Sequence, residues 1–173
     1  MMDVVAIRAK ALLGCAEDAL EAAGVPACRV VWHPGADVPW DACGVADGGA
    51  EGQLAVAVER VFPSEQFPQE TAGAHRCHPN GFGANMVLTL LRCAATVTDQ
   101  MEAPSPEAVT ADAEKVSRDR DLMLQAILCC LFGEDADPGV FRLGGWEPLG
   151  PNGGCVGGRW RIQVALPACP CPD

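Results

Sequence analysis

Residues 155–166 alternate between apolar and polar side chains more regularly than any other part of the chain. Trp160, Ile162 and Val164 occupy one set of alternate positions, and Arg159 and Arg161 occupy the other. Successive side chains of a β-strand point to opposite faces, so this pattern predicts a strand with one buried and one solvated face. The preceding residues Pro151-Asn152-Gly153-Gly154 predict a tight turn after a first strand at 140–146, which makes a C-terminal β-hairpin.

Three other segments are typical of strands. Residues 28–33 are short and β-branched, and residues 53–62 place Leu54, Val56, Val58 and Phe62 on one face. The third segment, 86–98, has apolar residues in both sets of positions over its first half, which predicts burial on both faces.

Two segments predict helices. Residues 3–23 carry apolar side chains at intervals of three and four, and Gly24 follows as a stop. Ser105-Pro106-Glu107 is a favourable helix start, and the second helix is expected to run to about Phe132. On its solvated side we expect two charge pairs, Glu114 with Arg118 and Lys115 with Asp119.

This order predicts the α+β class, with a small mostly antiparallel sheet packed by an N-terminal helix and a long second helix and with the C-terminal hairpin. We expect a single domain over residues 1–173, with long loops at about 34–52 and 63–85 and a flexible tail at 167–173.

Charge and hydropathy exclude some classes of protein. The formal net charge is −11, which disfavours sequence-specific binding of nucleic acid, because phosphates are neutralised by clustered Lys and Arg. No stretch approaches the roughly 20 apolar residues of a membrane-spanning helix, and the start of the sequence carries an acid, Asp3, where a secretory signal would carry positive charge. We expect a protein that is made and kept inside the cell, with its ten cysteines reduced.

The densest group of metal-ligating residue types is His75, Cys77 and His78 in the second long loop. Cys43, Cys93 and His33 are possible distant partners for a tetrahedral zinc ion. A polar loop without metal is the simpler interpretation, because the chain has no Cys-x2-Cys pair. Cys129 and Cys130 in the second helix are expected to be packing residues, and the terminal Cys169 and Cys171 are too poorly preorganised for a site.

No motif for catalysis or phosphate binding is present. The sequence has no Gly-x-Ser-x-Gly elbow, and Gly81-Phe82-Gly83 lacks both the third glycine and the following helix of a dinucleotide-binding turn. We therefore name no catalytic residue and no cofactor.

The aromatic residues divide into core and surface candidates. Trp32 and Trp160 are expected in the core. The candidates for an interface are Trp40, Phe67, Phe82 and Trp146, because aromatic residues are enriched where proteins meet.

Taken together, the segments resemble one protein family in layout. They are VVWH, AVAVERVFP, LTLLRCAATVT, SPEAVTADAEKVSRDRDLMLQAIL and GGCVGGRWRIQVAL. Their order after an N-terminal helix resembles the tail-terminator and related head-to-tail joining proteins of long-tailed, siphovirus-like bacteriophages, particularly those of actinobacteria. The likeness spans nearly the whole chain but contains no diagnostic motif, so no functional residue is carried over from the family.

The resemblance implies a structural virion protein without catalytic activity. Copies of the chain would form a ring, expected to be a hexamer, that caps the tail tube protein and joins it to the head-side connector or stopper protein. DNA would pass through the ring, and the protein would be made in the host cytoplasm. The alternative is a cytosolic metal-binding or thiol-dependent enzyme centred on His75, Cys77 and His78.

Overall fold

Five strands form one sheet in the order β1-β2-β3-β5-β4 in the computed structural model, which describes residues 2–35, 38–40, 44, 49–71, 81–97, 102–131 and 140–166. The elements are α1 (Met2–Ala22), β1 (Arg29–His33), β2 (Gln53–Pro63), β3 (Phe82–Cys93), α2 (Pro106–Leu131), β4 (Phe141–Asn152) and β5 (Cys155–Leu166). Only β1 and β2 are parallel, and the other neighbouring pairs are antiparallel. The expected α+β class with its C-terminal hairpin is confirmed.

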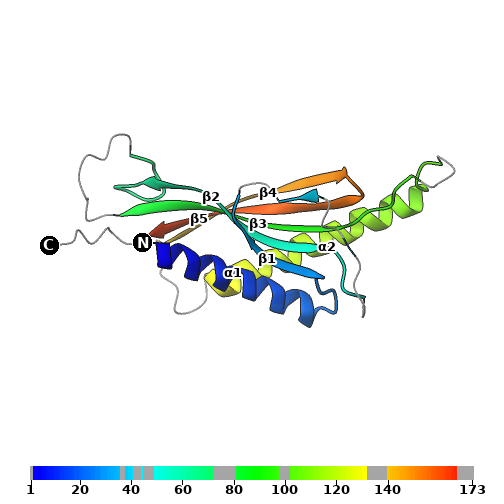
Figure 1. Cartoon of the computed structure of the whole chain (residues 1–173), viewed down its shortest axis with the longest axis horizontal. Coiled ribbons are helices and arrows are strands. Elements are labelled where there is room, and N and C mark those ends of the chain that lie inside the picture. Colours follow the sequence, from blue (N-terminus) through cyan, green and yellow to red (C-terminus); the bar gives the residue numbers. More distant parts are fainter. Residues whose placement is uncertain are drawn as a thin grey trace.

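Both helices pack on the same face of the sheet (Figure 1). The main core lies between the two layers, and its β5 residues Trp160, Ile162 and Val164 alternate as the sequence predicted. On β3, Met86 and Leu88 join this core while Val87 and Thr89 are buried on the other side, which confirms the predicted burial on both faces. From the helices come Leu12 and Leu20 on α1 and Met123 and Ile127 on α2. We call this side of the sheet the covered face.

The other side of the sheet, the open face, has no helix against it (Figure 1). A second, smaller apolar cluster lies at one end of this face, where Val38 packs with Ala55, Leu91 and Cys155. Trp40 is partly buried against the same cluster. Residues 38–40, between β1 and β2, therefore shield one end of the open face.

A bulge in β2 corrects one expectation about its faces. The register with β3 shifts between Val58 and Arg60, so that Phe62 lies opposite Gly83. Phe62 therefore leaves the face of Leu54 and Val56 and is buried on the open face. An extra residue reverses the alternation beyond it, and the sequence pattern carried no sign of this one.

Two strand boundaries also differ from the prediction. β3 begins at Phe82 rather than 86 and ends at Cys93 rather than 98, because Phe82–Asn85 pair with β2 and β5 on both sides. β4 continues to Asn152 despite Pro148 and Pro151. Proline is tolerated there because β4 is an edge strand, where a missing N–H leaves no ladder partner unpaired.

The helices begin and end close to the predicted residues. The Ser105 hydroxyl accepts a hydrogen bond from the Ala108 N–H at 3.2 Å, which caps α2 as expected. The predicted surface pair of Lys115 and Asp119 is wrong, because Asp119 is buried against Arg92 and Lys115 pairs with Glu51. The predicted pair of Glu114 and Arg118 is not formed either, since Arg118 lies beside Asp119 at 3.8 Å. Within the described residues, neither helix is apolar over a length that could cross a bilayer.

Candidate functional site

The residues proposed for a metal site are only partly within the described chain. His75, Cys77, His78 and Cys43 lie outside the described residues, as does most of the loop that carries them. The His33 ring lies beside its own turn, where its Nδ1 accepts a hydrogen bond from the Gly35 N–H at 3.2 Å. The described residues contain no group of three or more His, Cys, Asp or Glu side chains placed to hold a metal ion.

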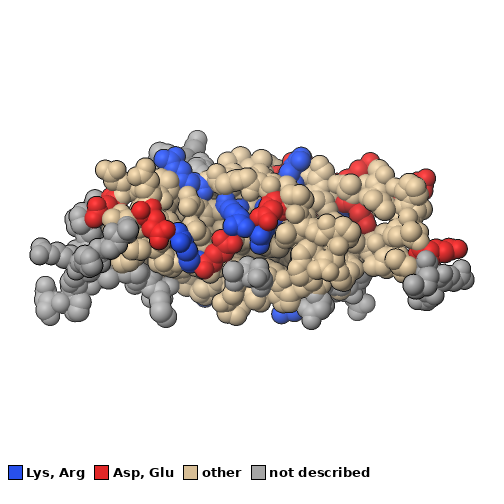
Figure 2. Space-filling view, turned by 90° about the horizontal axis from the view of Figure 1, so that it is seen from above, with Lys and Arg blue, Asp and Glu red and all other residues tan. Residues whose placement is uncertain are grey.

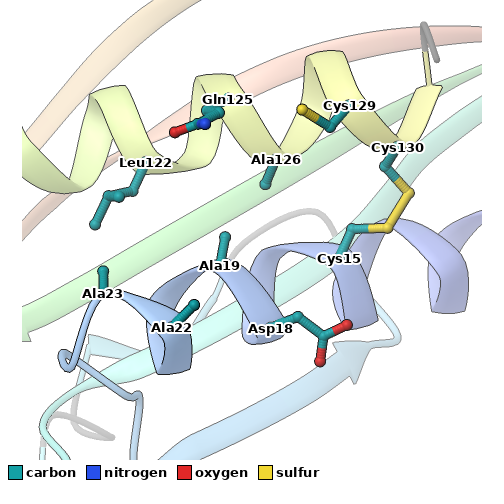
Figure 3. Close-up of a pocket in the computed structure, with 10 residues that line it drawn as sticks. All are labelled: Cys15, Asp18, Ala19, Ala22, Ala23, Leu122, Gln125, Ala126, Cys129 and Cys130. Carbon is teal, nitrogen blue, oxygen red and sulfur yellow. A yellow bond between two sulfur atoms is a disulfide. The ribbon is translucent and has the colours of Figure 1, made fainter.

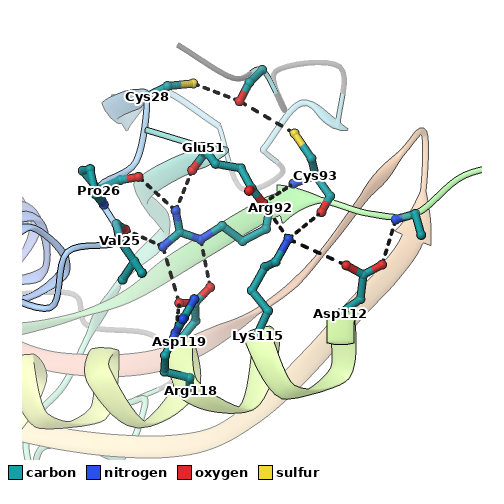
Figure 4. A network of polar contacts seen from close by, with 12 residues as sticks. Val25, Pro26, Cys28, Glu51, Arg92, Cys93, Asp112, Lys115, Arg118 and Asp119 are labelled. Carbon is teal, nitrogen blue, oxygen red and sulfur yellow. Dashed lines mark hydrogen bonds and ion pairs between the residues drawn. The ribbon is translucent and has the colours of Figure 1, made fainter. Parts of the chain in front are cut away.

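Cys93 lies close to another free thiol, Cys28, at the end of the sheet. Both sulfur atoms face the carbonyl oxygen of Gly44, at 3.3 Å from Cys28 and 3.7 Å from Cys93 (Figure 4). Burial, followed by the carboxylate of Glu51, raises the pKa of the Cys93 thiol. Cys93 is therefore a thiol rather than a thiolate at neutral pH, which makes it a poor nucleophile.

The largest polar network in Figure 4 holds the end of β3 to α2 and to the turn after α1. Arg92 donates from Nε to Asp119 at 2.8 Å, and its other nitrogens donate to the backbone carbonyls of Val25, Pro26 and Glu51. The Arg92 and Asp119 side chains are only 3% and 4% exposed. Since this ion pair is inaccessible and hydrogen-bonded within the chain, its role is structural.

A disulfide joins the two helices, contrary to the expectation that the cysteines are reduced. Cys15 on α1 is bonded to Cys130 on α2, with 6.1 Å between their Cα atoms (Figure 3). Cys155 is disulfide-bonded as well. Cysteines 115 residues apart in the sequence give no sign of pairing until the fold brings the helices together.

A groove runs beside the Cys15–Cys130 bond along the outer surface of α1 and α2 (Figure 3). Its volume is about 530 Å³, and it is lined mainly by small side chains, such as Ala19, Ala22 and Ala126. Cys129, the residue next to the disulfide, is a free and exposed cysteine in this groove. Nothing in the described residues indicates what would occupy it.

The four interface candidates from the sequence are all partly buried. Trp146 packs against Trp160 with 5.6 Å between ring centroids, and a side chain at Gly158 would overlap its ring. Trp40 lies against the small cluster on the open face. One side of each indole is thus used in packing. Phe82 packs beside the main core, and Phe67 is half-buried in the turn after β2.

The most exposed tryptophan among the described residues is Trp32, which the sequence assigned to the core. Its side chain is 40% exposed because β1 is an edge strand. Ile7 on α1 and Val61 on β2 are also exposed, at 62% and 45%. Of the three, only Trp32 lies on the edge strand β1. Val61 lies beyond the part of β2 that pairs with β1, and Ile7 is next to Arg8, whose guanidinium lies over the Phe141 ring of β4.

The other end of the open face carries charge instead of apolar side chains. Arg159 and Arg161 on β5 both bind Glu147 on β4, with N–O distances of 2.9 and 3.1 Å. Arg161 also lies 3.5 Å from Glu59 on β2. Figure 2, which looks at the molecule from the side away from α1, shows Arg and Lys interspersed with Asp and Glu along this surface.

Arg142 completes this charged group, and the sequence analysis did not single it out. It lies opposite Gln163 in the hairpin, and its exposed side chain makes no ion pair with a described residue. The signal that could have found it is the polar face predicted for β5, because residues paired with that face share its side of the sheet.

Comparison with known proteins adds no relative to this picture. No family model matches the chain, and no curated protein is similar enough to count as related to it.

Proposed function

We propose that this chain is a structural subunit of a phage neck, a ring-forming tail terminator that caps the tail tube and joins it to the head-side connector. The proposal rests on the resemblance in layout, and the observed order of helix, three strands, long helix and hairpin supports it. In this role the chain acts by presenting surfaces to its neighbours and carries out no reaction.

The observation that carries the proposal is the presence of unlike surfaces on different sides of one small protomer. The exposed Trp32 lies on β1 at one edge of the sheet, and the arginine-bearing part of the open face lies on β4 and β5 at the opposite edge. Copies in a ring contact each other through two different patches, one on each side of the protomer. Surfaces of different chemistry are what such contacts require, and further surfaces remain for the tube and the connector.

The acidic balance is also compatible with a neck ring. With a formal charge of −11, the chain does not present a large basic surface that would hold DNA phosphates during passage.

Native mass spectrometry of the purified protein, with and without chelator, tests this proposal against the metal-binding alternative. A closed oligomer of defined copy number without bound metal is the expected result, and negative-stain images should then show rings. Mixing the protein with tail tubes should increase the fraction in rings. A monomer that holds one metal ion per chain and unfolds when the ion is removed would contradict the proposal.

A further inference from the structure

A pocket of about 240 Å³ opens on the charged part of the open face. It lies where β4 bulges, between Leu143 and Trp146, so that Gly144 leaves space beside Arg161. Arg142 and Arg161 line the pocket together with Glu59 and with Asn85 and Gln163, whose side-chain amides are hydrogen-bonded to each other. Guanidinium N–H groups are donors that bind a carboxylate.

The charges around this pocket are not balanced. Arg161 is shared between Glu147 and Glu59, and Arg159 binds Glu147 as well. Arg142 has no carboxylate partner among the described residues. Among the described residues, three arginines face two glutamates here, an excess of one positive charge in a chain of net charge −11. A guanidinium beside a polar pocket in an acidic protein is placed to bind an external carboxylate.

An unpaired carboxylate group is available on the opposite side of the same protomer. Glu107, Glu114 and Asp121 are spaced seven residues apart on α2, and we call them the acidic stripe. Glu107 and Glu114 are exposed and make no ion pair with a described residue, whereas Asp121 binds Arg120 at 2.8 Å. Hydrogen bonds from its own backbone N–H and from the Ser105 hydroxyl lower the pKa of Glu107, so it is ionised at neutral pH.

We infer that the pocket beside Arg142 binds the acidic side of α2 of a second copy, with Glu114 as the carboxylate that meets Arg142. The inference rests on the proposed function and names the contact from which the ring is built. Glu107 lies two helical turns from Glu114, about 10.5 Å along the axis. The Cα atoms of Arg142 and Arg161 are about 8 Å apart, given the strand rise and the strand spacing. The spacing of the two glutamates along α2 is therefore similar in scale to the spacing of the two arginines on the sheet.

The positions of the two surfaces determine how copies associate. α2 packs on the covered face, where the Trp160 indole N–H donates to the Arg120 carbonyl, whereas Arg142 lies on the open face. The acidic stripe and the pocket therefore cannot meet within one chain. Contact between two copies leaves one unused surface of each kind, so association is head-to-tail and closes into a ring when the rotation per copy allows it.

A charge swap tests the contact directly. Arg142→Glu should weaken self-association by roughly tenfold, measured by sedimentation velocity over a concentration series in low salt, because it places like charges together. The double variant Arg142→Glu/Glu114→Arg restores opposite charges and should recover most of the lost affinity. High salt should weaken the wild-type contact and leave less difference between the variants.

Lys10→Glu is the matched control. Lys10 is an exposed cation on α1 with no ion pair to a described residue, so its reversal changes the net charge equally but should leave association unchanged apart from that general effect. Circular dichroism and thermal unfolding confirm that each variant is folded, which is expected because Arg142 is exposed.

The outcomes separate this inference from the proposed function. If the wild type forms closed rings and Arg142→Glu weakens them no more than Lys10→Glu does, this inference is wrong and the proposed ring stands. If the wild type instead forms open linear assemblies, and these are lost in Arg142→Glu and restored in the double variant, the contact is supported and the proposed closed ring is contradicted. A wild-type protein that stays monomeric at every concentration in low salt would overturn the contact between copies.

Discussion

The two faces of the sheet differ in what their side chains do. The covered face is mainly apolar and includes Leu54, Met86, Leu88, Ile162 and Val164, all at most 1% exposed, with the buried Arg92–Asp119 ion pair at one end. The open face has a small apolar cluster at one end and Arg142, Arg159 and Arg161 at the other. The chain thus folds mainly through the covered face, and the open face carries the exposed charged side chains.

This difference predicts how substitutions divide between stability and assembly. Changes on the covered face should lower the free energy of unfolding, because they remove burial or leave a buried group unpaired. Changes at the charged end of the open face should alter stability little, because exposed ion pairs contribute only about 0–1 kcal/mol.

The largest loss of stability is expected for Asp119→Ala. It leaves the Arg92 guanidinium buried on the covered side without its carboxylate, which costs about 3–5 kcal/mol in comparable cases. Urea unfolding monitored by tryptophan fluorescence measures the change. Asp121→Ala is the matched control two residues along the same helix, where the side chain is 63% exposed, and it should stay within about 0.5 kcal/mol of wild type. Equal losses in the two variants would show that the buried pair does not stabilise the fold.

Asp119 also shows where sequence reasoning reaches its limit. Its spacing from Lys115 predicts a helix surface pair, since residues four apart lie on one side of a helix. The true partner, Arg92, is on β3 and is 27 residues earlier in the chain. The location of the helix and its cap follow from local chemistry and were predicted correctly, whereas this partner depends on how α2 packs on the sheet.

The second largest loss of stability is expected for Trp160→Ala. It should lower the free energy of unfolding by about 3 kcal/mol, at the lower end of the range for a buried tryptophan. The side chain is 8% exposed, and Trp146 can move into part of the space. Trp40→Ala on the open face is the comparison and should cost roughly half as much, because Trp40 is only partly buried there. A larger loss for Trp40→Ala would mean that the small cluster stabilises the fold more than the covered face does.

The tryptophans illustrate the same division between local and distant information. The alternation on β5 placed Trp160 correctly, because a period of two reports which face is buried. β1 is as β-branched as a buried strand, yet its place at the edge of the sheet leaves Trp32 exposed. Strand order is not encoded in a single strand, so the exposure of Trp32 could not be predicted from the sequence.

Breaking the Cys15–Cys130 bond should have the next largest effect. The bond closes a long loop, with 115 residues between its ends, and such bonds stabilise by about 2–4 kcal/mol, by constraining the unfolded chain in the chain-entropy model. Cys130→Ser should lower the urea midpoint accordingly, and addition of a reductant should lower the wild-type midpoint at least as far, because Cys155 is disulfide-bonded as well. Cys129→Ser alters the adjacent free thiol and should change the midpoint little. An unchanged midpoint in Cys130→Ser would show that the helices are held by packing alone.

The smallest effect on stability is expected at Glu147 on the open face. Hydrogen bonds from Arg159 first, and then from Arg161, lower the pKa of Glu147 below its ordinary value. A carboxyl group whose pKa is lowered in the folded state stabilises the protein above its unfolded pKa, and this stabilisation is lost as the pH falls through the folded pKa. Because Glu147 is 44% exposed, its contribution should be below about 1 kcal/mol.

Glu147→Gln tests this sign and sharpens the comparison of the two faces. At neutral pH the variant should unfold at a slightly lower urea concentration than wild type, and the difference should disappear once the pH lies well below the ordinary glutamate pKa of about 4.3. A difference that persists at acidic pH would mean that Glu147 acts through packing rather than charge. The same variant releases Arg159 and Arg161 from their shared carboxylate and makes the patch more positive. If this face binds an acidic partner, self-association should therefore increase while stability falls, a combination that no substitution on the covered face should produce.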